Sequence, residues 1–351
     1  MKRASKTRTE ASKSVDLRAL AECVEQFATK KIVLLGDFVA DEFQFGEISR
    51  VSREAPVLIL RHRETLIVPG GGANAANNFA AMGAKTFLVT MVGDDPAGSA
   101  LIAHFRGLGV DVSGIVTVKG RSTPTKTRFL AGWAHTVAQQ VLRVDREPQA
   151  EIPANAAKRI ARLLESRLRS ADALAVSDYG FGVATPGLVR QARSERKNLL
   201  ITLDARYQLS AYANAGVSAA TPNEAELEAS HGVSIGQNSE ALSQCGAATL
   251  SSMKLKSLLV TRGRDGMALF EPADQMTRIA IHGSDEAVDV TGAGDTVLAA
   301  YTLALGCGGS PLEAAHIANI AGGLVVMKRG TATVSRQELL DGIRVQAGAA
   351  K

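Results

Sequence analysis

The sequence predicts an α/β fold in which helices cover both faces of a central, mostly parallel sheet. Short apolar segments of strand length alternate with amphipathic segments of helix length over most of the 351 residues, and this alternation is typical of parallel sheets. A polar residue or a glycine follows six of these apolar segments: Asp37, Asp94, Asp178, Asp204, Asn223 and Gly263. Because such sheets bind ligands beyond the carboxyl ends of their strands, we expect these residues to share one site.

The amino-terminal third contains helices and strands in this order. An amphipathic helix is expected over residues 16–28, with Asp16 as its N-cap, before the strand "KIVLLGD" that ends at Asp37. The segment "APVLILRHRETLIVPGGG" predicts two further short strands, and "GGGANAANNFAAMGA" predicts a helix of small residues. The strand "KTFLVTMVGDD" and a helix over residues 96–108 follow.

The pattern changes between residues 112 and 146, where strand-like segments follow one another without a helix between them. This region predicts a small antiparallel patch within the alternating chain. The alternation returns at Pro153, in a helix whose apolar residues share one face: Ile160, Leu163, Leu164 and Leu168. Further strands and helices follow, and the chain closes with two helices.

The composition excludes several classes of protein. Hydrophobic residues make up 46% of the chain, but no apolar run reaches the roughly 18 residues that a membrane helix needs. The formal net charge of +5 suits an anionic ligand, and without a basic stripe interleaved with aromatic residues it does not indicate nucleic-acid binding. The basic residues 1–14 lack the apolar centre of a secretory signal. A transit peptide has a similar composition, but Glu10 counts against it, so we expect a solvated tail.

The cysteines and histidines predict neither a disulfide framework nor a zinc site. Cys23, Cys245 and Cys307 are scattered and odd in number, which fits a reducing compartment and a cytoplasmic protein. The six histidines form no HxH or HExxH pair, and no cysteine pair has a zinc spacing.

The segment "TGAGD" is the strongest chemical signal in the chain. The backbone N–H groups of Gly292, Ala293 and Gly294 can converge on an anion, and the helix that follows adds its positive end. Asp295 would lie on the first turn of that helix and stay ionised. An ionised carboxylate beside an anion hole suits the transfer of a phosphoryl group to a hydroxyl. The alternative is a glycine-rich turn with a capping aspartate.

A second glycine loop, "PGGGANAANNFAAMGA", allows two interpretations. Gly70, Gly72 and Ala75 match GxGxxG/A, and Asp94 lies about 20 residues further on, as in dinucleotide-binding units. The asparagines of this loop do not favour the tight packing that such a motif serves. Asn74 is instead predicted to bond the hydroxyls of a ligand.

Three shorter motifs complete the predicted site, and each has a structural alternative. In "TPNEAELE", an amide and a carboxylate three residues apart can orient hydrated magnesium, or Glu226 can cap the helix. The glycine turn "VTRGRDG" suits nucleotide phosphates, or it is an ordinary turn. In "GDFVADEF", Asp37 and Asp41 can bind a vicinal diol, although such acids are often surface charges.

Together these motifs resemble the ribokinase-like (PfkB) family of carbohydrate kinases over about residues 31–340. Both family signatures are present in order, "GGGANAANNFAAMGAKTFLVTMVG" and "DVTGAGDTVLAAY". The resemblance implies a kinase domain over residues 31–345 with a small β-sheet lid, from segments at about 41–60 and 115–144, after a basic tail and first helix in residues 1–30. It also implies ATP and Mg²⁺, with a monovalent cation as a further candidate cofactor, and a homodimer formed through the lid.

The same resemblance assigns roles to individual residues. It makes Asp295 the catalytic base, with Gly292, Ala293 and Gly294 as the anion hole. The residues implied to hold the sugar are Asp37, Asp41, Gly71, Gly72, Asn74, Lys126, Arg128 and Asp178. The residues implied to serve ATP are Asn223, Glu226, Thr261, Gly263, Gly266 and Asn319, with Glu226 holding Mg²⁺ through water.

Within this family the segments "FGEISRVSREAPVLIL", "TPTKTRFL" and "QQVLRVD" are most similar to D-glycero-β-D-manno-heptose 7-phosphate kinases. The chain departs from their pattern at two cationic positions: Phe181 stands where a lysine is usual, and "DARY" replaces Asp-Pro-Lys. Arg206, Lys126 and Arg128 are the residues that can compensate. The alternatives are a kinase for fructose, ribose or a nucleoside, a catalytically silent sugar or nucleotide sensor, and a dinucleotide-dependent oxidoreductase.

Overall fold

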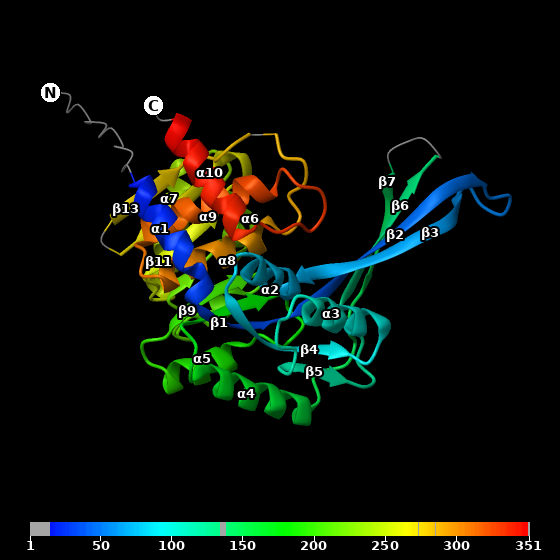
Figure 1. Cartoon of the computed structure of the whole chain (residues 1–351), viewed down its shortest axis with the longest axis horizontal. Coiled ribbons are helices and arrows are strands. Elements are labelled where there is room, and N and C mark those ends of the chain that lie inside the picture. The colour runs from blue at the N-terminus through cyan, green and yellow to red at the C-terminus, as the bar shows by residue number, and fades with distance from the viewer. Residues whose placement is uncertain (1–14, 134–137, 273, 285, 350–351) are drawn as a thin grey trace.

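The main body is built on one large sheet, in a computed structural model that describes residues 15–133, 138–272, 274–284 and 286–349. Within these residues the sheet has nine strands in the order β13-β12-β11-β10-β9-β8-β1-β4-β5 (Figure 1). Its strands are β1 (Lys31–Gly36), β4 (Lys85–Gly93), β5 (Ile115–Val118), β8 (Ala173–Asp178), β9 (Leu200–Ala205), β10 (Ala219–Ala220), β11 (Ser257–Thr261), β12 (Met267–Glu271) and β13 (Asp274–Ile279). The pairs from β5 to β11 are parallel, and β12 and β13 are antiparallel additions.

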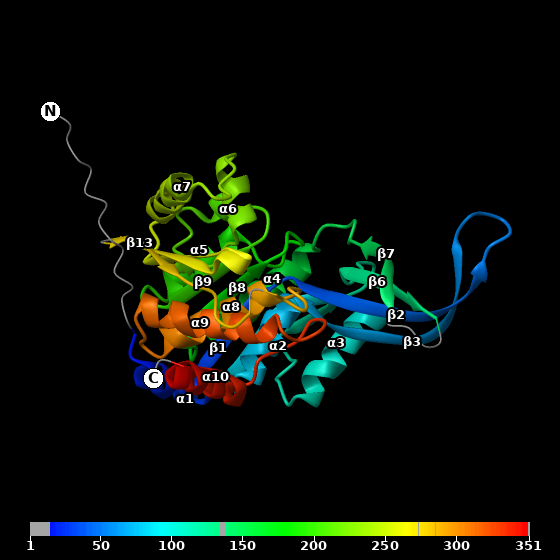
Figure 2. The same cartoon turned by 90° about the horizontal axis from the view of Figure 1, so that it is seen from above.

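Helices cover both faces of this sheet (Figure 2). One face carries α1 (Leu17–Glu25), α2 (Gly72–Ala81), α3 (Pro96–Gly107), α8 (Ala293–Gly306), α9 (Pro311–Val325) and α10 (Arg336–Ala349). The other carries α4 (Ala154–Leu168), α5 (Pro186–Glu195), α6 (Glu224–His231) and α7 (Ser239–Ser252). Short 3-10 turns are η1 (Gln26–Thr29), η2 (Leu209–Tyr212) and η3 (Gly263–Asp265). The apolar side chains of β1 alternate between the two cores, with Ile32 and Leu34 in one and Val33 and Leu35 in the other.

The helices form where the apolar spacing predicts them. Asp16 caps α1 as expected, because its side chain accepts a hydrogen bond from the backbone N–H of Arg18. Leu20 and Val24 of α1 are buried in the core. The helix that the sequence grouped with the tail therefore packs as part of the folded body, while residues 1–14 lie outside the described residues.

A four-stranded lid projects from the body (Figure 1). It contains β2 (Phe38–Val51), β3 (Leu58–Gly71), β6 (Thr125–Gly132) and β7 (Gln139–Arg146), in the order β3-β2-β6-β7. The β2–β6 pair is parallel, and the other two pairs are antiparallel. The main parallel sheet and this second small sheet confirm the predicted fold class.

Two details of the lid differ from the expectation. The segment expected to give two short strands forms the single long strand β3, because it pairs with β2 along its whole length. The segment Ile115–Val118 belongs to the main sheet, where it pairs with β4, and not to the lid. Ile115, Val116 and Val118 are buried. The short apolar pattern of this strand predicts a strand but does not show which of the two sheets it joins.

Two of the exclusions drawn from composition can be compared with the structure. Among the described helices, none is long and apolar enough to cross a membrane. Cys23, Cys245 and Cys307 are free thiols.

Candidate active site

The site is centred on the N-terminus of α8, where "TGAGD" folds into a turn and the first helical residues. Gly292 is the N-cap with φ +78°, a left-handed conformation that favours glycine. A Cβ at this position would lie 2.3 Å from Asn74 Nδ2. Asp295 is the third residue of α8 and is buried. The predicted glycine-to-helix geometry is thus present, with the carboxylate beside the helix N-terminus.

Two donors from different elements hold the Asp295 carboxylate. Asn74 Nδ2 on α2 donates to Asp295 Oδ2 at 2.9 Å, and the Tyr179 hydroxyl after β8 donates to Oδ1 at 3.1 Å. Asn74 also donates to the Gly292 carbonyl at 3.3 Å. The Asn74 amide that the sequence assigned to ligand hydroxyls therefore bonds the predicted base, and its contact with a sugar stays a prediction.

The electrostatics of Asp295 differ from the expectation of an ordinary ionised helix cap. Burial raises the pKa of Asp295 to about 7, whereas the hydrogen bonds from Asn74 and Tyr179 lower it. Among nearby charges, Asp41 raises this pKa and Lys126 lowers it. Loss of water thus outweighs the favourable helix end, and a pKa near neutrality suits a general base.

The backbone N–H groups of the turn are not equivalent. The Ala293 N–H donates to the Val290 carbonyl at 3.3 Å. In the described part of the chain, the N–H groups of Gly292 and Gly294 have no acceptor. Two of the three predicted anion-hole amides are therefore available to a phosphoryl group, at the positive end of α8.

On the lid side of Asp295, Asp41 forms a buried ion pair. Its Oδ1 accepts from Arg128 Nη1 at 2.5 Å, and its Oδ2 accepts from the Thr331 hydroxyl at 3.1 Å. Gly70 is needed beside it, because a Cβ there would lie 2.5 Å from Asp41 Oδ2. The structure thus brings Asp41 and Arg128 together on the same side as Asp295, in the region assigned to the sugar.

Asp37 has a different environment from Asp41. Its carboxylate accepts hydrogen bonds from the backbone N–H groups of Tyr179, Phe181 and Val183, at 2.9, 3.0 and 2.8 Å. Burial raises the pKa of Asp37 to about 6, although these three bonds lower it. Asp37 therefore shapes the turn after β8, and its predicted contact with a sugar stays a prediction.

Asp178, Gly71 and Gly72 also have local structural partners. Asp178 accepts from the Gly180 N–H at 2.8 Å and from the Tyr212 hydroxyl at 2.7 Å. Gly71 has φ +55°, and the Gly72 N–H donates to the Asp37 carbonyl at 2.9 Å. A Cβ at Gly72 would lie 2.9 Å from that carbonyl oxygen. Asp178 thus fixes the turn after β8, and Gly72 holds the second glycine loop beside the end of β1.

Cations gather around the ring of Tyr179. Lys126 Nζ lies 5.5 Å from the ring centroid, and Arg206 Cζ lies 5.9 Å from it. Burial lowers the pKa of Lys126, Asp41 raises it, and nearby Arg206 and Arg143 lower it further. Lys126 and Arg143 come from the lid and Arg206 follows β9, so the lid and the body both supply positive charge.

A cleft of about 160 Å³, open to solvent, lies on the other side of the α8 N-terminus. Four of its lining residues are those the sequence assigned to ATP: Thr261, Gly263, Gly266 and Asn319. Ala293 and Gly294 line it as well, so the cleft reaches the predicted anion hole. Its walls include Met267 and Val297, and such an apolar, concave site suits a nucleoside.

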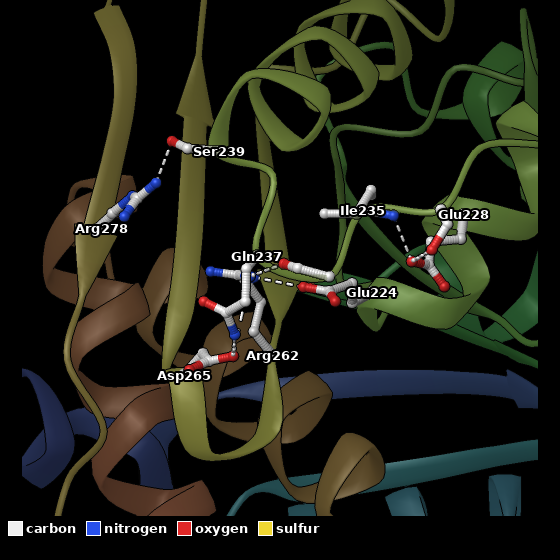
Figure 3. Close-up of polar contacts among 10 residues, drawn as sticks. Glu224, Glu228, Ile235, Gln237, Ser239, Arg262, Asp265 and Arg278 are labelled. Carbon is white, nitrogen blue, oxygen red and sulfur yellow. Dashed lines mark hydrogen bonds and ion pairs between the residues drawn. The ribbon is translucent and has the colours of Figure 1, made fainter.

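An arginine behind this cleft ties the glycine turn to neighbouring elements (Figure 3). Arg262 Nε donates to Glu224 on α6 at 2.5 Å, and its Nη2 donates to the Gly236 carbonyl at 2.9 Å. Gln237 Nε2 donates to Asp265 at 3.3 Å. The Arg262 side chain is only 10% exposed, so this network fixes the position of the turn.

Asn223 and Glu226 form a reciprocal helix cap. Asn223 Oδ1 accepts from the Glu226 N–H at 2.8 Å, and Glu226 Oε2 accepts from the Asn223 N–H at 2.9 Å. The capping alternative is therefore the geometry of this pair. Neither residue lines the cleft described above.

The capped Glu226 still lies near other acids. Burial, Glu226 and Asp295 raise the pKa of Asp204 well above its usual value, and Arg206 lowers it. Among the described residues, no group of three His, Cys, Asp or Glu side chains could hold a metal by itself. Mg²⁺ commonly uses one or two carboxylates together with substrate phosphates and water, so the acidic surroundings of Glu226 fit this ion when a nucleotide is bound.

Two residues of the site escaped the sequence analysis. The Tyr179 hydroxyl reaches Asp295 from a loop after β8, and the Thr331 hydroxyl reaches Asp41 from a loop before α10. The position of Tyr179 just after strand-end Asp178 was a signal that it borders the site. Its hydrogen bond depends on the packing of distant elements, which no local pattern contains.

Comparisons with known proteins agree with this geometry. Residues 29–338 match the family model described as pfkB family carbohydrate kinase. The proteins named Bifunctional protein HldE from Desulfatibacillum aliphaticivorans and Geobacter sulfurreducens are 36% and 37% identical over 319 residues, or 90% of this chain. The chain spans 63% of the length of each of these relatives.

Solved structures share the fold at low sequence identity. Ribokinase from Arabidopsis thaliana, complexed with ribose and ATP, aligns with a TM-score of 0.67 and 20% identity over 90% of this chain and 99% of its own. Phosphofructokinase-2 from Escherichia coli, in complex with substrates and products, aligns with a TM-score of 0.70 and 18% identity over 91% and 99%. These similarities confirm the ribokinase-like fold.

The fold, the glycine turn with its buried carboxylate, and the adjoining cleft together fit a phosphotransferase of small molecules. The chain belongs to the pfkB family of carbohydrate kinases. This membership confirms the predicted class of enzyme, a carbohydrate kinase, and the oxidoreductase alternative based on the Gly70 loop is wrong.

Proposed function

We propose that the enzyme phosphorylates a sugar that already carries a phosphate, with D-glycero-β-D-manno-heptose 7-phosphate as the acceptor. The observation that carries this proposal is the pair of cations over the Tyr179 ring, Lys126 and Arg206. Among the described residues, neither forms an ion pair with a carboxylate, unlike Arg128 and Arg143. Two unpaired cations beside the base suit a phosphate group, and relatives named HldE support the heptose class.

In the proposed reaction, ATP occupies the cleft with its γ-phosphoryl at the Gly292 and Gly294 amides. Asp295 takes the proton of the acceptor hydroxyl, whose oxygen forms a bond to the γ-phosphorus. The bond from that phosphorus to the β–γ bridging oxygen breaks, and ADP leaves. The two amides and the α8 N-terminus stabilise the charge on the transferring group.

We also propose that Mg²⁺ acts as a cofactor, held through water by Glu226 near the nucleotide phosphates. When bound, the ion neutralises phosphate charge during transfer. A monovalent cation is a further proposed cofactor, for which one solved structure of E. coli phosphofructokinase-2, in complex with potassium, gives the support. Assays with and without KCl test this second ion.

We further propose a homodimer formed through the lid. Exposed apolar side chains gather on the lid strands and include Val51 at 59%, Leu58 at 45% and Leu142 at 55% exposure. Apolar side chains left exposed along a projecting sheet suit a protein interface. E. coli phosphofructokinase-2 has a tetrameric inhibited form. Leu142→Glu is expected to shift the molecular mass measured by light scattering from dimer to monomer.

The acceptor is tested with ATP and a panel of heptose 7-phosphate, heptose, fructose, fructose 6-phosphate, ribose and nucleosides. We expect turnover with heptose 7-phosphate and a loss of at least about tenfold in kcat/KM with unphosphorylated heptose. Equal rates for both heptoses would overturn the phosphate requirement.

Phe181 favours a second candidate, a kinase of an unphosphorylated sugar, because it stands where heptose 7-phosphate kinases usually have a lysine. Its backbone carbonyl accepts a hydrogen bond from Arg121 Nη2 at 2.7 Å. Faster turnover of ribose or fructose than of any phosphorylated sugar in the same panel would favour this candidate.

A further inference from the structure

Tyr179 connects the predicted base to the cations of the sugar side. Its hydroxyl donates to Asp295 Oδ1 at 3.1 Å. Its ring lies within 6 Å of both Lys126 Nζ and Arg206 Cζ. Its backbone N–H donates to Asp37 Oδ2 at 2.9 Å, which fixes the residue at the end of β8. Tyr179 therefore contacts the predicted base, both cations and Asp37, which follows β1.

We infer that Tyr179 is a positioning residue for phosphoryl transfer, whose hydroxyl fixes the Asp295 carboxylate and whose ring fixes Lys126 and Arg206. This inference rests on the proposed function, because it takes Asp295 as the base and the two cations as the phosphate site. The inference extends the proposed function because it gives one residue a role at the base and at the phosphate site.

The hydroxyl completes the hold on the carboxylate. Asn74 on α2 already bonds Oδ2, and a single donor leaves the carboxylate free to rotate about its Cβ–Cγ bond. A second donor on Oδ1, from the loop after β8, fixes the plane of the group. A base must be held in one orientation for efficient proton transfer.

The chemistry of the phenol suits this task. Burial and the neighbouring Asp295 carboxylate raise the pKa of Tyr179, so the hydroxyl keeps its proton and remains a donor throughout the working pH range. A donor to a carboxylate stabilises the ionised form. The other charged groups near Asp295 are Asp41 on β2, Lys126 on β6 and Asp204 on β9, and none of them is changed by removing the hydroxyl.

The ring has a separate part in the same inference. Lys126 and Arg206 come from the lid and the body, respectively, and both lie near the face of the Tyr179 ring, with Arg206 also 5.8 Å from the Tyr207 ring centroid. A phosphate that binds both cations would therefore lie close to the residue that holds the base. This arrangement would hold the phosphate end of the acceptor at a fixed distance from the hydroxyl that reacts at Asp295.

Two variants separate the hydroxyl from the ring. They are assayed with heptose 7-phosphate, or with the panel member that the wild type phosphorylates fastest. Tyr179→Phe is expected to lower kcat about tenfold and to move the acid limb of kcat/KM up by about one pH unit, with the acceptor KM changed by less than about twofold. Tyr179→Leu is expected to raise that KM about tenfold as well.

Tyr301→Phe is the matched control, because it removes a buried hydroxyl from α8 itself. Tyr301 lies six residues after Asp295 on α8 and donates to the Ser257 hydroxyl at 2.8 Å. We expect this control to keep the wild-type acid limb even where its thermal stability falls. An equal shift of the acid limb in Tyr301→Phe and Tyr179→Phe would overturn the inference.

Asp295→Asn distinguishes the failure of the inference from the failure of the proposed function. If Asp295→Asn retained turnover, Asp295 would not be the base, and the proposed function would fail together with the inference. An inactive Asp295→Asn together with wild-type kcat and acid limb in Tyr179→Phe would leave the base in place and overturn the role of Tyr179 alone.

Discussion

The two sides of the α8 N-terminus, proposed to bind the sugar and the nucleotide, are built by different physical means. The sugar side consists of charged side chains, with Asp41 and Arg128 in a buried ion pair and Asp295 held by two donors. The nucleotide side is a cleft lined mainly by glycines and apolar side chains, with Arg264 at its wall, while Arg262 lies behind the wall in its own ion pair. The first side depends on charge, and the second depends on shape and backbone position.

This difference determines which substitutions each side tolerates. On the sugar side, a change of charge with no change of shape should be severe, because buried charges need their partners. On the nucleotide side, added atoms should matter more than changed charge, since glycines allow the close approach of a ligand.

Gly292→Ala should affect both sides at once, because Gly292 lies between them. The new Cβ would lie 2.3 Å from Asn74 Nδ2 at a φ of +78°. We expect kcat to fall about a hundredfold, as when an anion-hole donor is lost. Gly306→Ala at the other end of α8 is the control, because its Cβ would meet no atom within 4 Å. Steady-state kinetics of both variants provide the measurement, and similar losses in both would contradict the account.

Asp41→Asn should damage the sugar side alone. It keeps the shape of the side chain but leaves the Arg128 guanidinium, 2.5 Å away, without its counter-charge. We expect the acceptor KM to rise at least about tenfold, with a loss of about 3 kcal/mol in the free energy of unfolding. The KM for ATP should stay the same. A rise in the ATP KM as large as that for the acceptor would show that the two sides are not separate.

Arg262→Ala should damage the nucleotide side alone, and by less. Loss of its bonds to Glu224 and Gly236 frees the glycine turn that lines the cleft. We expect the KM for ATP to rise about fivefold at an unchanged acceptor KM. Arg344→Ala is the control, because its pair with Asp341 is exposed and such pairs contribute little. An ATP KM in Arg262→Ala equal to that of the control would contradict this prediction.

The smallest predicted effect concerns stability and pH. Burial raises the pKa of Asp295 in the folded chain to about 7, above its value of about 3.9 in the unfolded chain. The folded state therefore binds this proton more tightly, and the stabilisation is full below pH 4 and lost as the pH rises through 7. Relative to Asp295→Asn, the wild type should lose Tm between pH 5 and 8. A constant difference in Tm over this range would contradict it.

The parts of the site that the sequence could predict are those built by contiguous residues. The turn before Asp295 and the four cleft residues of the ATP prediction are positioned by local glycine geometry and by the ends of parallel strands. What the sequence could not predict depends on long-range packing. The backbone N–H groups on Asp37 come from residues more than a hundred positions away, and so does the Tyr179 hydroxyl on Asp295.

The same distinction applies to the fold. Alternation of strands and helices predicted the layers correctly, because each apolar stripe must be covered locally. It did not assign β5 to a sheet, since pairing partners are chosen by tertiary contacts. It also did not show that α1 packs into the core against α10, which lies at the other end of the sequence.

The central claim is that Asp295 takes the proton of the acceptor hydroxyl while the amides at the α8 N-terminus hold the phosphoryl group. Asp295→Asn tests it most directly, with kcat measured in an ADP-release assay and ATP binding measured by calorimetry on the same protein. We expect kcat to fall by at least about a hundredfold, while the Kd for ATP changes by less than about threefold. A variant that keeps turnover within about tenfold of the wild type would contradict the claim.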